Sequence, residues 1–180
     1  MREIGVLPSA IVLEPAARNT APAAAIAALK IAEQQGDGIV LLLPSDHVVT
    51  DQQAFARALD IALDAAAKGN IVTFGIKPSK PETGYGYIET GKEIAQGAHA
   101  VARFAEKPDA ETAKAWLKGS KHLWNSGMFM FRADVLIEEL TFHAPDVLKA
   151  AREALAKAKG DLDFLRLDKD AFSCAPEISI

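Results

Sequence analysis

The chain has 180 residues, about half of them apolar, and a formal net charge of −4. It can bury one ordinary hydrophobic core, but its interleaved charges form no basic stripe for nucleic acid or an anionic membrane. We therefore expect small-molecule chemistry, with no nucleic-acid and no membrane partner. The single cysteine, Cys174, cannot form an internal disulfide, and no apolar run is long enough to span a bilayer, so we expect a soluble, cytoplasmic protein.

The first part of the chain alternates between strand and helix. Residues 10–14, "AIVLE", predict a short strand, and residues 20–36 predict an alanine-rich helix. Thr20 is the candidate N-cap of this helix and Gly36 lies at its end. Residues 38–44, "GIVLLLP", are apolar on both faces, which is typical of a central parallel strand.

A second helix and a third strand repeat this pattern. Thr50 and Gln53 form a capping box for the helix "DQQAFARALDIALDAAAKG", and residues 70–76, "NIVTFGI", predict a buried strand. Two strand–helix–strand crossovers predict a doubly wound α/β core, with a mostly parallel sheet flanked by helices.

The second half predicts an α+β elaboration of this core. A loop rich in proline and glycine leads into β-type segments around 85–90 and 100–106, and a short helix capped by Asp109 follows. Residues 125–132, "NSGMFMFR", predict a strand, and residues 133–158 predict one or two helices.

Three polar loops follow the predicted strands of the core: "PAARNT", "PSDHVV" and "KPSKPETGYG". Ligands of open parallel sheets bind beyond the carboxyl ends of the strands. In the second loop, Asp46 is a candidate ligand for Mg²⁺ on nucleotide phosphates; the equally weighted alternative is that Ser45 or Asp46 only shapes the turn. His47 is better explained as a packed or hydrogen-bonded neighbour than as a base.

The loop "PAARNT" brings Arg18 to the start of a predicted helix. Free N–H groups and the positive end of the helix dipole attract anions there, and Arg18 can grip a phosphate or a base edge. The alternative is that Asn19 or Thr20 caps the helix while Arg18 is solvated. Capping accounts for Asn19 or Thr20 but assigns no role to Arg18, so we expect Arg18 to bind the nucleotide.

Three further motifs carry chemistry, each with a simpler alternative. In "TGYGYIE" the glycines allow close approach of a ligand and Tyr85 can pack on a sugar ring, or the segment is only a turn. In "RFAEKP", Glu106 suits vicinal hydroxyls and Lys107 suits a phosphate, or the two form a surface ion pair. In "LWNSGMF", Asn125 and Gly127 lie beside Trp124, which we interpret as a packing residue.

Together the motifs "EPAARNTAPA", "LLLPSDHVV", "TFGIKPSKPETGYGYIE", "VARFAEKPD" and "LWNSGMFMFRADVL" closely resemble those of bacterial mannose-1-phosphate guanylyltransferases, in order and spacing. The resemblance covers nearly the whole chain. It includes the nucleotidyltransferase half of the enzymes that also isomerise mannose 6-phosphate. It implies a GT-A-like, Rossmann-like fold, Mg²⁺, and the reaction of GTP with α-mannose 1-phosphate to give GDP-mannose and diphosphate.

The resemblance also implies roles for individual residues. Asp46 would hold Mg²⁺, and Asp46 and Lys107 would be the catalytic residues. The other members of the expected site would bind the substrates. The nucleotide would contact Glu14, Arg18, Asn19 and Thr20, with Ser45 beside the metal ligand; the sugar phosphate would contact Gly84, Tyr85, Glu106, Lys107 and Asn125.

The chain departs from the family pattern at both ends. The expected glycine-rich loop does not precede "REIGVLPSAIVLEP", and the sequence stops at "APEISI". We expect residues 1–180 to be the central part of a single nucleotidyltransferase domain, incomplete at both ends. Two alternatives remain: a binding module without turnover, and a fragment without autonomous function. A missing first strand would leave an apolar sheet edge, so we expect a homo-oligomer.

Overall fold

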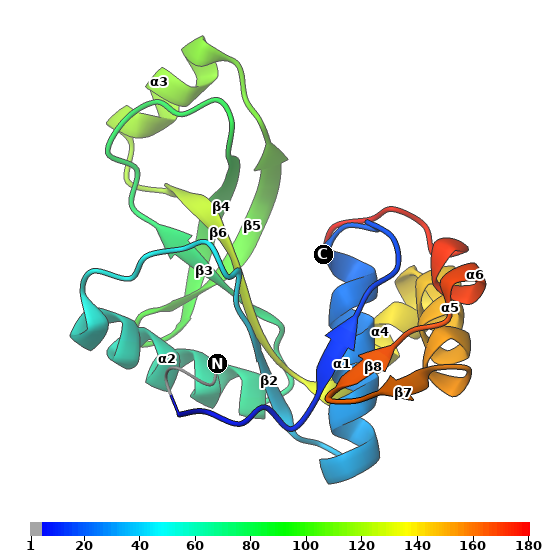
Figure 1. The fold of residues 1–180 in the computed structure, drawn as a ribbon. Helices are drawn as coiled ribbons and strands as arrows, with labels where there is room; N and C mark the ends of the chain where they lie inside the picture. Colours follow the sequence, from blue (N-terminus) through cyan, green and yellow to red (C-terminus); the bar gives the residue numbers. More distant parts are fainter. Residues whose placement is uncertain (1–4) are drawn as a thin grey trace. The chain divides into compact units, whose positions relative to one another are not determined.

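The structure, a computed structural model, describes residues 5–180, and they form a mixed α/β protein with sheets flanked by helices (Figure 1). The expected α/β class is confirmed. The chain divides into two compact units. Within the described residues, unit 1 comprises 5–38 and 133–180, and unit 2 comprises 39–132.

Unit 2 is built on a five-stranded sheet. Its strands are β2 (Ile39–Leu42), β3 (Val72–Ile76), β4 (Gly86–Ala95), β5 (Ala98–Glu106) and β6 (His122–Arg132). The order is β2–β6–β4–β5, and β3 also pairs with β6. The predicted strands are confirmed, and β4 is longer than the sequence indicated because it forms a hairpin with β5 around Gly97.

The strand β6 organises this sheet because it has neighbours along both edges. Phe129 and Met130 pair with β2 and with β3, and Trp124 pairs with β3 and with β4. Therefore β2 and β4 share one edge of β6, and β3 lies along the other. Between the β4 ladder and the β2 ladder, residues 125–128 have no strand partner on the shared edge within the described chain.

The pairing within the sheet is less parallel than the sequence indicated. Both β2 and β3 run antiparallel to β6, so the crossover through α2 (Gln52–Ala67) does join two strands of the same direction. These two strands are not paired with each other, since β6 lies between them. The described ladders of this sheet are all antiparallel, and the parallel pair is β1–β8 of unit 1.

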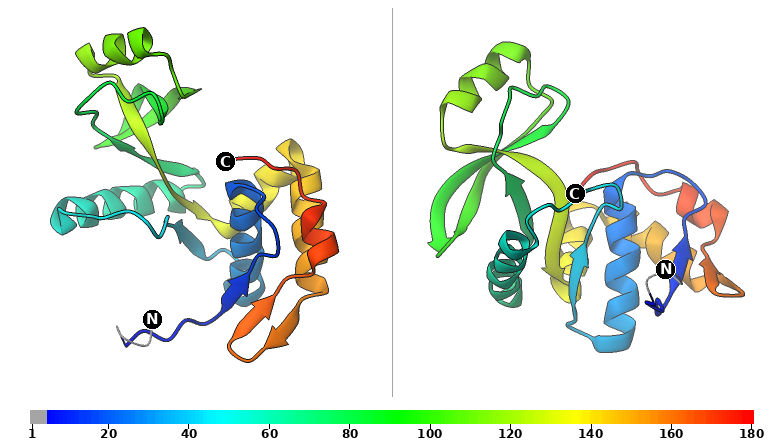
Figure 2. Two further views of the ribbon diagram at one scale, coloured as in Figure 1. Left: turned by 45° about the horizontal axis from the view of Figure 1, so that its top comes forward. Right: turned by 60° about the vertical axis from the view of Figure 1, so that its left-hand side comes forward.

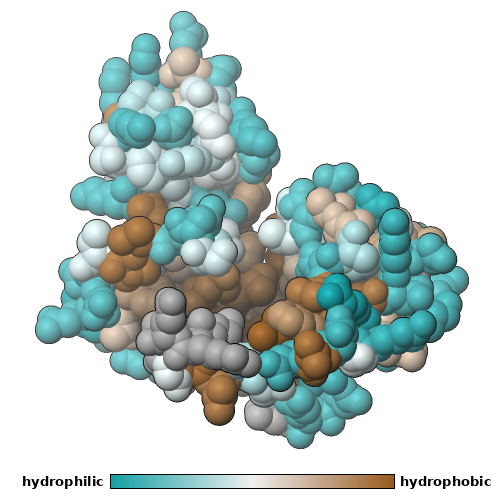
Figure 3. All heavy atoms as spheres, in the orientation of Figure 1, coloured by the Kyte–Doolittle hydropathy of each residue, from teal (hydrophilic) through white to brown (hydrophobic). Residues whose placement is uncertain are grey.

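Helices cover both faces of the sheet. On one face, Ala62 and Ala66 of α2 form a core cluster with Met130. On the other face, Trp116 of α3 (Ala110–Lys118) packs on Tyr87 with ring centroids 5.1 Å apart. The outer side of α3 faces solvent, and hydrophilic residues dominate the surface around it (Figure 3).

Unit 1 is a group of helices with a small sheet. The helices are α1 (Thr20–Gln35), α4 (Ala133–His143), α5 (Pro145–Ala156) and α6 (Lys169–Ser173). The strands are β1 (Ile11–Leu13), β7 (Lys159–Asp161) and β8 (Phe164–Arg166), in the order β1–β8–β7. Figure 2 shows α1 beside α4 and α5, and its contact face consists of small residues such as Ala24, Ala25 and Ala28, all fully buried. Small side chains let helices approach closely.

Two helix starts differ from the sequence prediction by one residue. Asn19, not Thr20, is the N-cap of α1, because its Oδ1 accepts the Thr20 N–H at 3.0 Å. Asp51, not a box of Thr50 and Gln53, caps α2, since its carboxylate accepts the Ala54 N–H at 2.8 Å. A carboxylate at the positive end of the helix is a better acceptor than a hydroxyl.

This correction gives a first prediction. Replacing Asp51 with alanine should lower the free energy of unfolding by about 1 kcal/mol, because the Ala54 N–H and the helix dipole lose their partner. The matched Thr50→Ala should change it much less. Urea unfolding followed by circular dichroism measures both. The capping-box interpretation would be restored if Thr50→Ala proved the more damaging change.

Candidate functional site

The segment Asn125–Met128 forms a bulge in β6, and its sequence explains the shape. Asn125 Oδ1 accepts the Gly127 N–H at 3.2 Å, and Ser126 Oγ accepts the Met128 N–H at 3.1 Å. Gly127 has φ 70°, a left-handed conformation that favours glycine. The pairing of β3 shifts between Thr73 and Gly75 opposite this bulge. The bulge therefore lies in the part of β6 between the β4 and β2 ladders, and its own backbone holds the Asn125 amide.

Across β4 and β5, Gly86 brings Glu106 and Asn125 close together. Gly86 pairs with Glu106, and it precedes Tyr87, whose pairing with Trp124 is the last rung of the β4–β6 ladder before Asn125. A Cβ at Gly86 would lie 2.7 Å from Glu106 Oε2 and 3.6 Å from Asn125 Cβ. A side chain at position 86 would therefore displace the Glu106 carboxylate from its present place. We call Asn125, Gly86 and Glu106 the floor of the candidate site; it carries a carboxylate acceptor and an amide on either side of a glycine.

Tyr85 and Lys107 border this floor. The Lys107 N–H donates to the Tyr85 carbonyl at 3.2 Å, and the ammonium lies 3.5 Å from Glu106 Oε1. Lys107 has φ 45°, an uncommon conformation for a residue with a side chain. The Tyr85 ring stands edge-on to Trp124 with centroids 5.3 Å apart. Sequence-predicted Gly84, Tyr85, Glu106, Lys107 and Asn125 thus gather at one end of the β4–β5–β6 sheet.

The loop after β2 lies beside the β6 bulge. A Cβ at Gly127 would be 3.7 Å from Pro44 Cγ. Ser45 and Asp46 follow in this loop, and the Asp46 side chain is 86% exposed. His47 Nε2 is 4.0 Å from Asp46 Oδ1. The carboxylate is therefore free to meet a ligand, although within residues 5–180 no group of three His, Cys, Asp or Glu residues is placed to hold a metal.

In unit 1, the residues predicted to bind nucleotide surround the N-terminus of α1. Arg18 Nη2 donates to the Ser173 carbonyl at 2.6 Å, so Arg18 has a structural task that the sequence did not indicate. Its Nε is buried and lacks a hydrogen-bond partner in the described chain. Partial removal from water raises the pKa of the Glu14 carboxyl above its ordinary value.

The same helix end is also held by residues 178–180. The Ala21 N–H donates to the Ile178 carbonyl at 3.0 Å, and the Ile180 N–H donates to Thr20 Oγ1 at 3.1 Å. Ser179 Oγ donates to Asn19 Oδ1 at 3.0 Å. Several groups expected at an anion site are therefore already paired within unit 1.

Sequence reasoning missed two residues of the site, Gly86 and Thr73. Gly86 belongs to the quoted glycine motif, but its role depends on the register with Glu106. Thr73 lies in an apolar strand, where a single hydroxyl gives little signal, and its Oγ1 donates to Asn125 Oδ1 at 3.1 Å.

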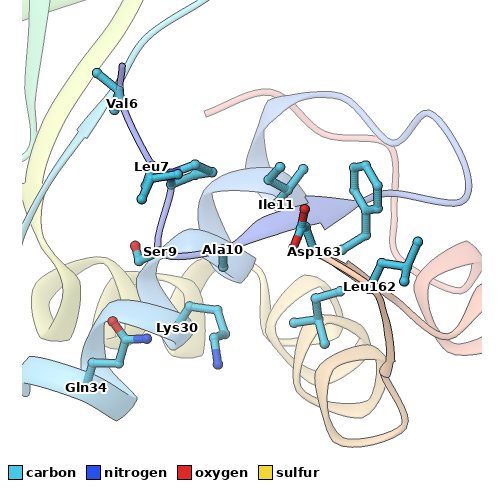
Figure 4. Close-up of a pocket in the computed structure, with 12 residues that line it drawn as sticks. Val6, Leu7, Ser9, Ala10, Ile11, Lys30, Gln34, Leu162 and Asp163 are labelled. Atoms are coloured by element: carbon cyan, nitrogen blue, oxygen red, sulfur yellow. The ribbon is translucent and has the colours of Figure 1, made fainter. Parts of the chain in front are cut away.

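Two cavities are lined almost wholly by other residues, although Thr73 is part of the lining of the second. One, of about 620 Å³, is lined in unit 1 by Leu7, Lys30, Leu162 and neighbouring residues (Figure 4). The other, of about 540 Å³, lies in unit 2 between α2 and β3–β5 and is mostly apolar. Neither contains the charged residues of the candidate site.

Residues 2–170 match the sequence model of the nucleotidyl transferase family, and the chain belongs to this family. It is 52% identical over 180 residues to the xanthan biosynthesis protein XanB of Xanthomonas campestris and 50% identical over 180 residues to a mannose-1-phosphate guanylyltransferase of Sinorhizobium fredii. A crystal structure of mannose-6-phosphate isomerase from Helicobacter pylori superposes with a TM-score of 0.82 and 35% identity over 95% of this chain. The expected resemblance is thereby confirmed.

The chain spans only part of these relatives. It covers 38% of XanB, 35% of the Sinorhizobium enzyme and 65% of the Helicobacter chain. Nucleotidyltransferases of this kind generally use a divalent metal ion. Across residues 5–180, the helices are too short or too polar to cross a membrane.

A histidine beside this site gives a prediction about pH. His122, 15% exposed, stacks on Trp116 with centroids 4.5 Å apart. Burial lowers the pKa of His122 below its ordinary value near 6.5, aided by Arg103 and Lys121 and opposed by Glu89. The folded protein thus disfavours the charged imidazole. Its contribution to stability is fully present above pH 6.5 and is lost as the pH falls below that value.

Lowering the pH from 7.5 to 5.5 should therefore destabilise the wild type more than His122→Phe, which keeps an aromatic ring but does not titrate. Denaturant unfolding at the two pH values measures this difference. His99→Phe, at an exposed position of β5, is the control and should retain the wild-type dependence. Equal pH dependence in His122→Phe and wild type would contradict the prediction.

Proposed function

We propose that this chain forms the substrate-binding part of an enzyme that transfers the guanylyl group of GTP to α-mannose 1-phosphate, giving GDP-mannose and diphosphate. The observation that carries the proposal is the floor, where the Asn125 amide and the Glu106 carboxylate both lie close to Gly86. Family membership and the named relatives support it. Because one relative serves xanthan biosynthesis, we propose that the product supplies polysaccharide synthesis in the cytoplasm.

The floor suits the sugar phosphate. A carboxylate accepts hydrogen bonds from vicinal hydroxyls, and the Asn125 Nδ2 group can donate to a hydroxyl oxygen. Gly84 and Gly86 allow the sugar ring to approach the backbone, and the half-exposed Tyr85 ring offers it an apolar face. Lys107, with a 66% exposed side chain, can leave Glu106 and bind the phosphate.

We assign the nucleotide to the loop that begins at Glu14. Arg18 and the N-terminus of α1 supply a cationic group and a positive dipole end, with Asn19 and Thr20 beside them. The unpartnered Nε of Arg18 supports a ligand there, because a buried guanidinium N–H without an acceptor is costly. Ser45 would help to place the phosphates.

The reaction itself needs little covalent machinery. A phosphate oxygen of mannose 1-phosphate attacks the α-phosphorus of GTP, the bond from that phosphorus to the bridging oxygen breaks, and diphosphate leaves. The protein lowers the barrier by alignment and by neutralising negative charge. Lys107 would hold the attacking phosphate, while Glu106 and Asn125 fix the sugar to which it belongs.

Asp46 is suited to be one of the ligands of a magnesium ion. Mg²⁺ is usually held by one or two carboxylates together with substrate phosphates, and the exposed Asp46 carboxylate meets that need in part. The ion would supply positive charge near the phosphates. We also propose that the enzyme works as a homo-oligomer.

The sugar site can be tested by Glu106→Gln in the full protein. The neutral amide offers one acceptor oxygen in place of two charged ones, so its hydrogen bonds from the sugar hydroxyls are weaker. The KM for mannose 1-phosphate should therefore rise about tenfold or more. The KM for GTP should change little, because the nucleotide is assigned elsewhere. Diphosphate release measures both constants. Glu138→Gln, at an exposed position of α4, is the control. A wild-type KM for the sugar phosphate in Glu106→Gln would refute the assignment.

The metal assignment can be tested by Asp46→Asn. The neutral amide cannot balance the charge of the cation, so the Mg²⁺ concentration for half-maximal rate should rise and kcat should fall by about 100-fold. Calorimetric binding of Mg²⁺ with GTP should weaken while the melting temperature stays constant. The exposed Asp60→Asn of α2 is the control. Unchanged magnesium dependence would make Asp46 a turn residue only.

A further inference from the structure

We propose that Thr73 is a positioning residue for the sugar-phosphate site and acts through Asn125. This inference rests on the proposed function, because it concerns how the Asn125 amide is presented to the sugar phosphate. Thr73 lies on β3, on the opposite edge of β6 from the floor residue Gly86. It is the first residue of the motif "TFGIKPSKPETGYGYIE", but no role was predicted for it.

The hydrogen bonds around Asn125 determine the orientation of its amide. Oδ1 accepts from two sides: from Thr73 Oγ1 at 3.1 Å and from the Gly127 N–H at 3.2 Å. Because a backbone N–H can only donate, the atom beside Gly127 is the oxygen of the amide. The Nδ2 group must therefore point away from Gly127 and Thr73.

The Nδ2 group remains available for a ligand. Within the described chain it has no hydrogen-bond acceptor, and it is not among the buried polar atoms that lack a partner. It is therefore accessible. A ligand hydroxyl that donates to Glu106 could accept from Nδ2, which matches the arrangement of donor and acceptor on the floor.

Gly127 alone would fix this orientation only weakly. Its bond to Oδ1 closes a local turn of three residues, whereas Thr73 ties Oδ1 to a different strand. The Thr73 hydroxyl also lies 3.3 Å from the Met128 carbonyl, but its single proton can go to only one acceptor at a time, and Asn125 Oδ1 is the nearer of the two. Loss of this hydroxyl would free the amide to rotate and would let Nδ2 turn away from the sugar.

The test uses Thr73→Val and Thr73→Ser in the full protein. Valine keeps the branched shape but lacks the hydroxyl, so the KM for mannose 1-phosphate should rise on the order of tenfold. The KM for GTP should stay within twofold. Serine keeps the hydroxyl and should restore most of the affinity. The matched control is Thr90→Val, which removes a similar bond from Thr90 Oγ1 to the Lys121 carbonyl at 3.0 Å and should leave both KM values unchanged.

A double-mutant cycle separates positioning from strand packing. In an Asn125→Ala background, Thr73→Val should add less than a twofold change, since the residue through which it acts is gone. An undiminished effect in that background, or equal rises of both KM values in Thr73→Val, would overturn the inference. If Thr73→Val had wild-type kinetics while Asn125→Ala was impaired, the inference about Thr73 would be overturned and the proposed role of Asn125 would stand. Wild-type kinetics of Asn125→Ala would instead overturn the proposed function of Asn125, and the inference with it.

Discussion

The bulge at Asn125–Met128 is the constraint on which the architecture of unit 2 depends. β6 pairs with β4 near its start and with β2 near its end, and these two strands share one edge. If β6 were regular, its backbone N–H and C=O groups would be available to a neighbouring strand along this whole edge. Instead, the backbone N–H groups of Gly127 and Met128 turn to the side chains of Asn125 and Ser126. These two N–H groups are thus satisfied locally rather than by a neighbouring strand.

The same bulge decides which side chains reach which face. Trp124 and His122 share the face covered by α3, yet Met130, also an even-numbered residue, packs with Ala62 and Ala66 of α2. In a regular strand, side chains an even number of residues apart share a face. The extra residue in the bulge reverses the alternation, so one strand serves a site near its start and an apolar core near its end.

The sequence predicted the local secondary structure better than it predicted which strands pair with each other. Strands such as β2 and β3 and the cap at Asp109 were predictable, because apolar runs and capping side chains act within a few residues. The position of β6 between β2 and β3 was not predictable, because β6 begins about fifty residues after β3 and local patterns carry no information on such distant pairing. The segments β7, β8 and α6 were missed as well: each has five residues or fewer and lacks a periodic apolar pattern.

The two groups of predicted site residues differ in how far their surroundings support a ligand. Around α1, Thr20 and Asn19 accept hydrogen bonds from residues 179–180, and Arg18 donates to Ser173, so their polar groups largely serve unit 1 itself. Around the floor, Glu106 remains exposed, and the Nδ2 group of Asn125 has no acceptor within the described chain. A binding site needs polar groups that are held in place yet still have unused hydrogen-bonding capacity. Asn125 meets both conditions, because Gly127 and Thr73 occupy one end of its amide and leave the other free.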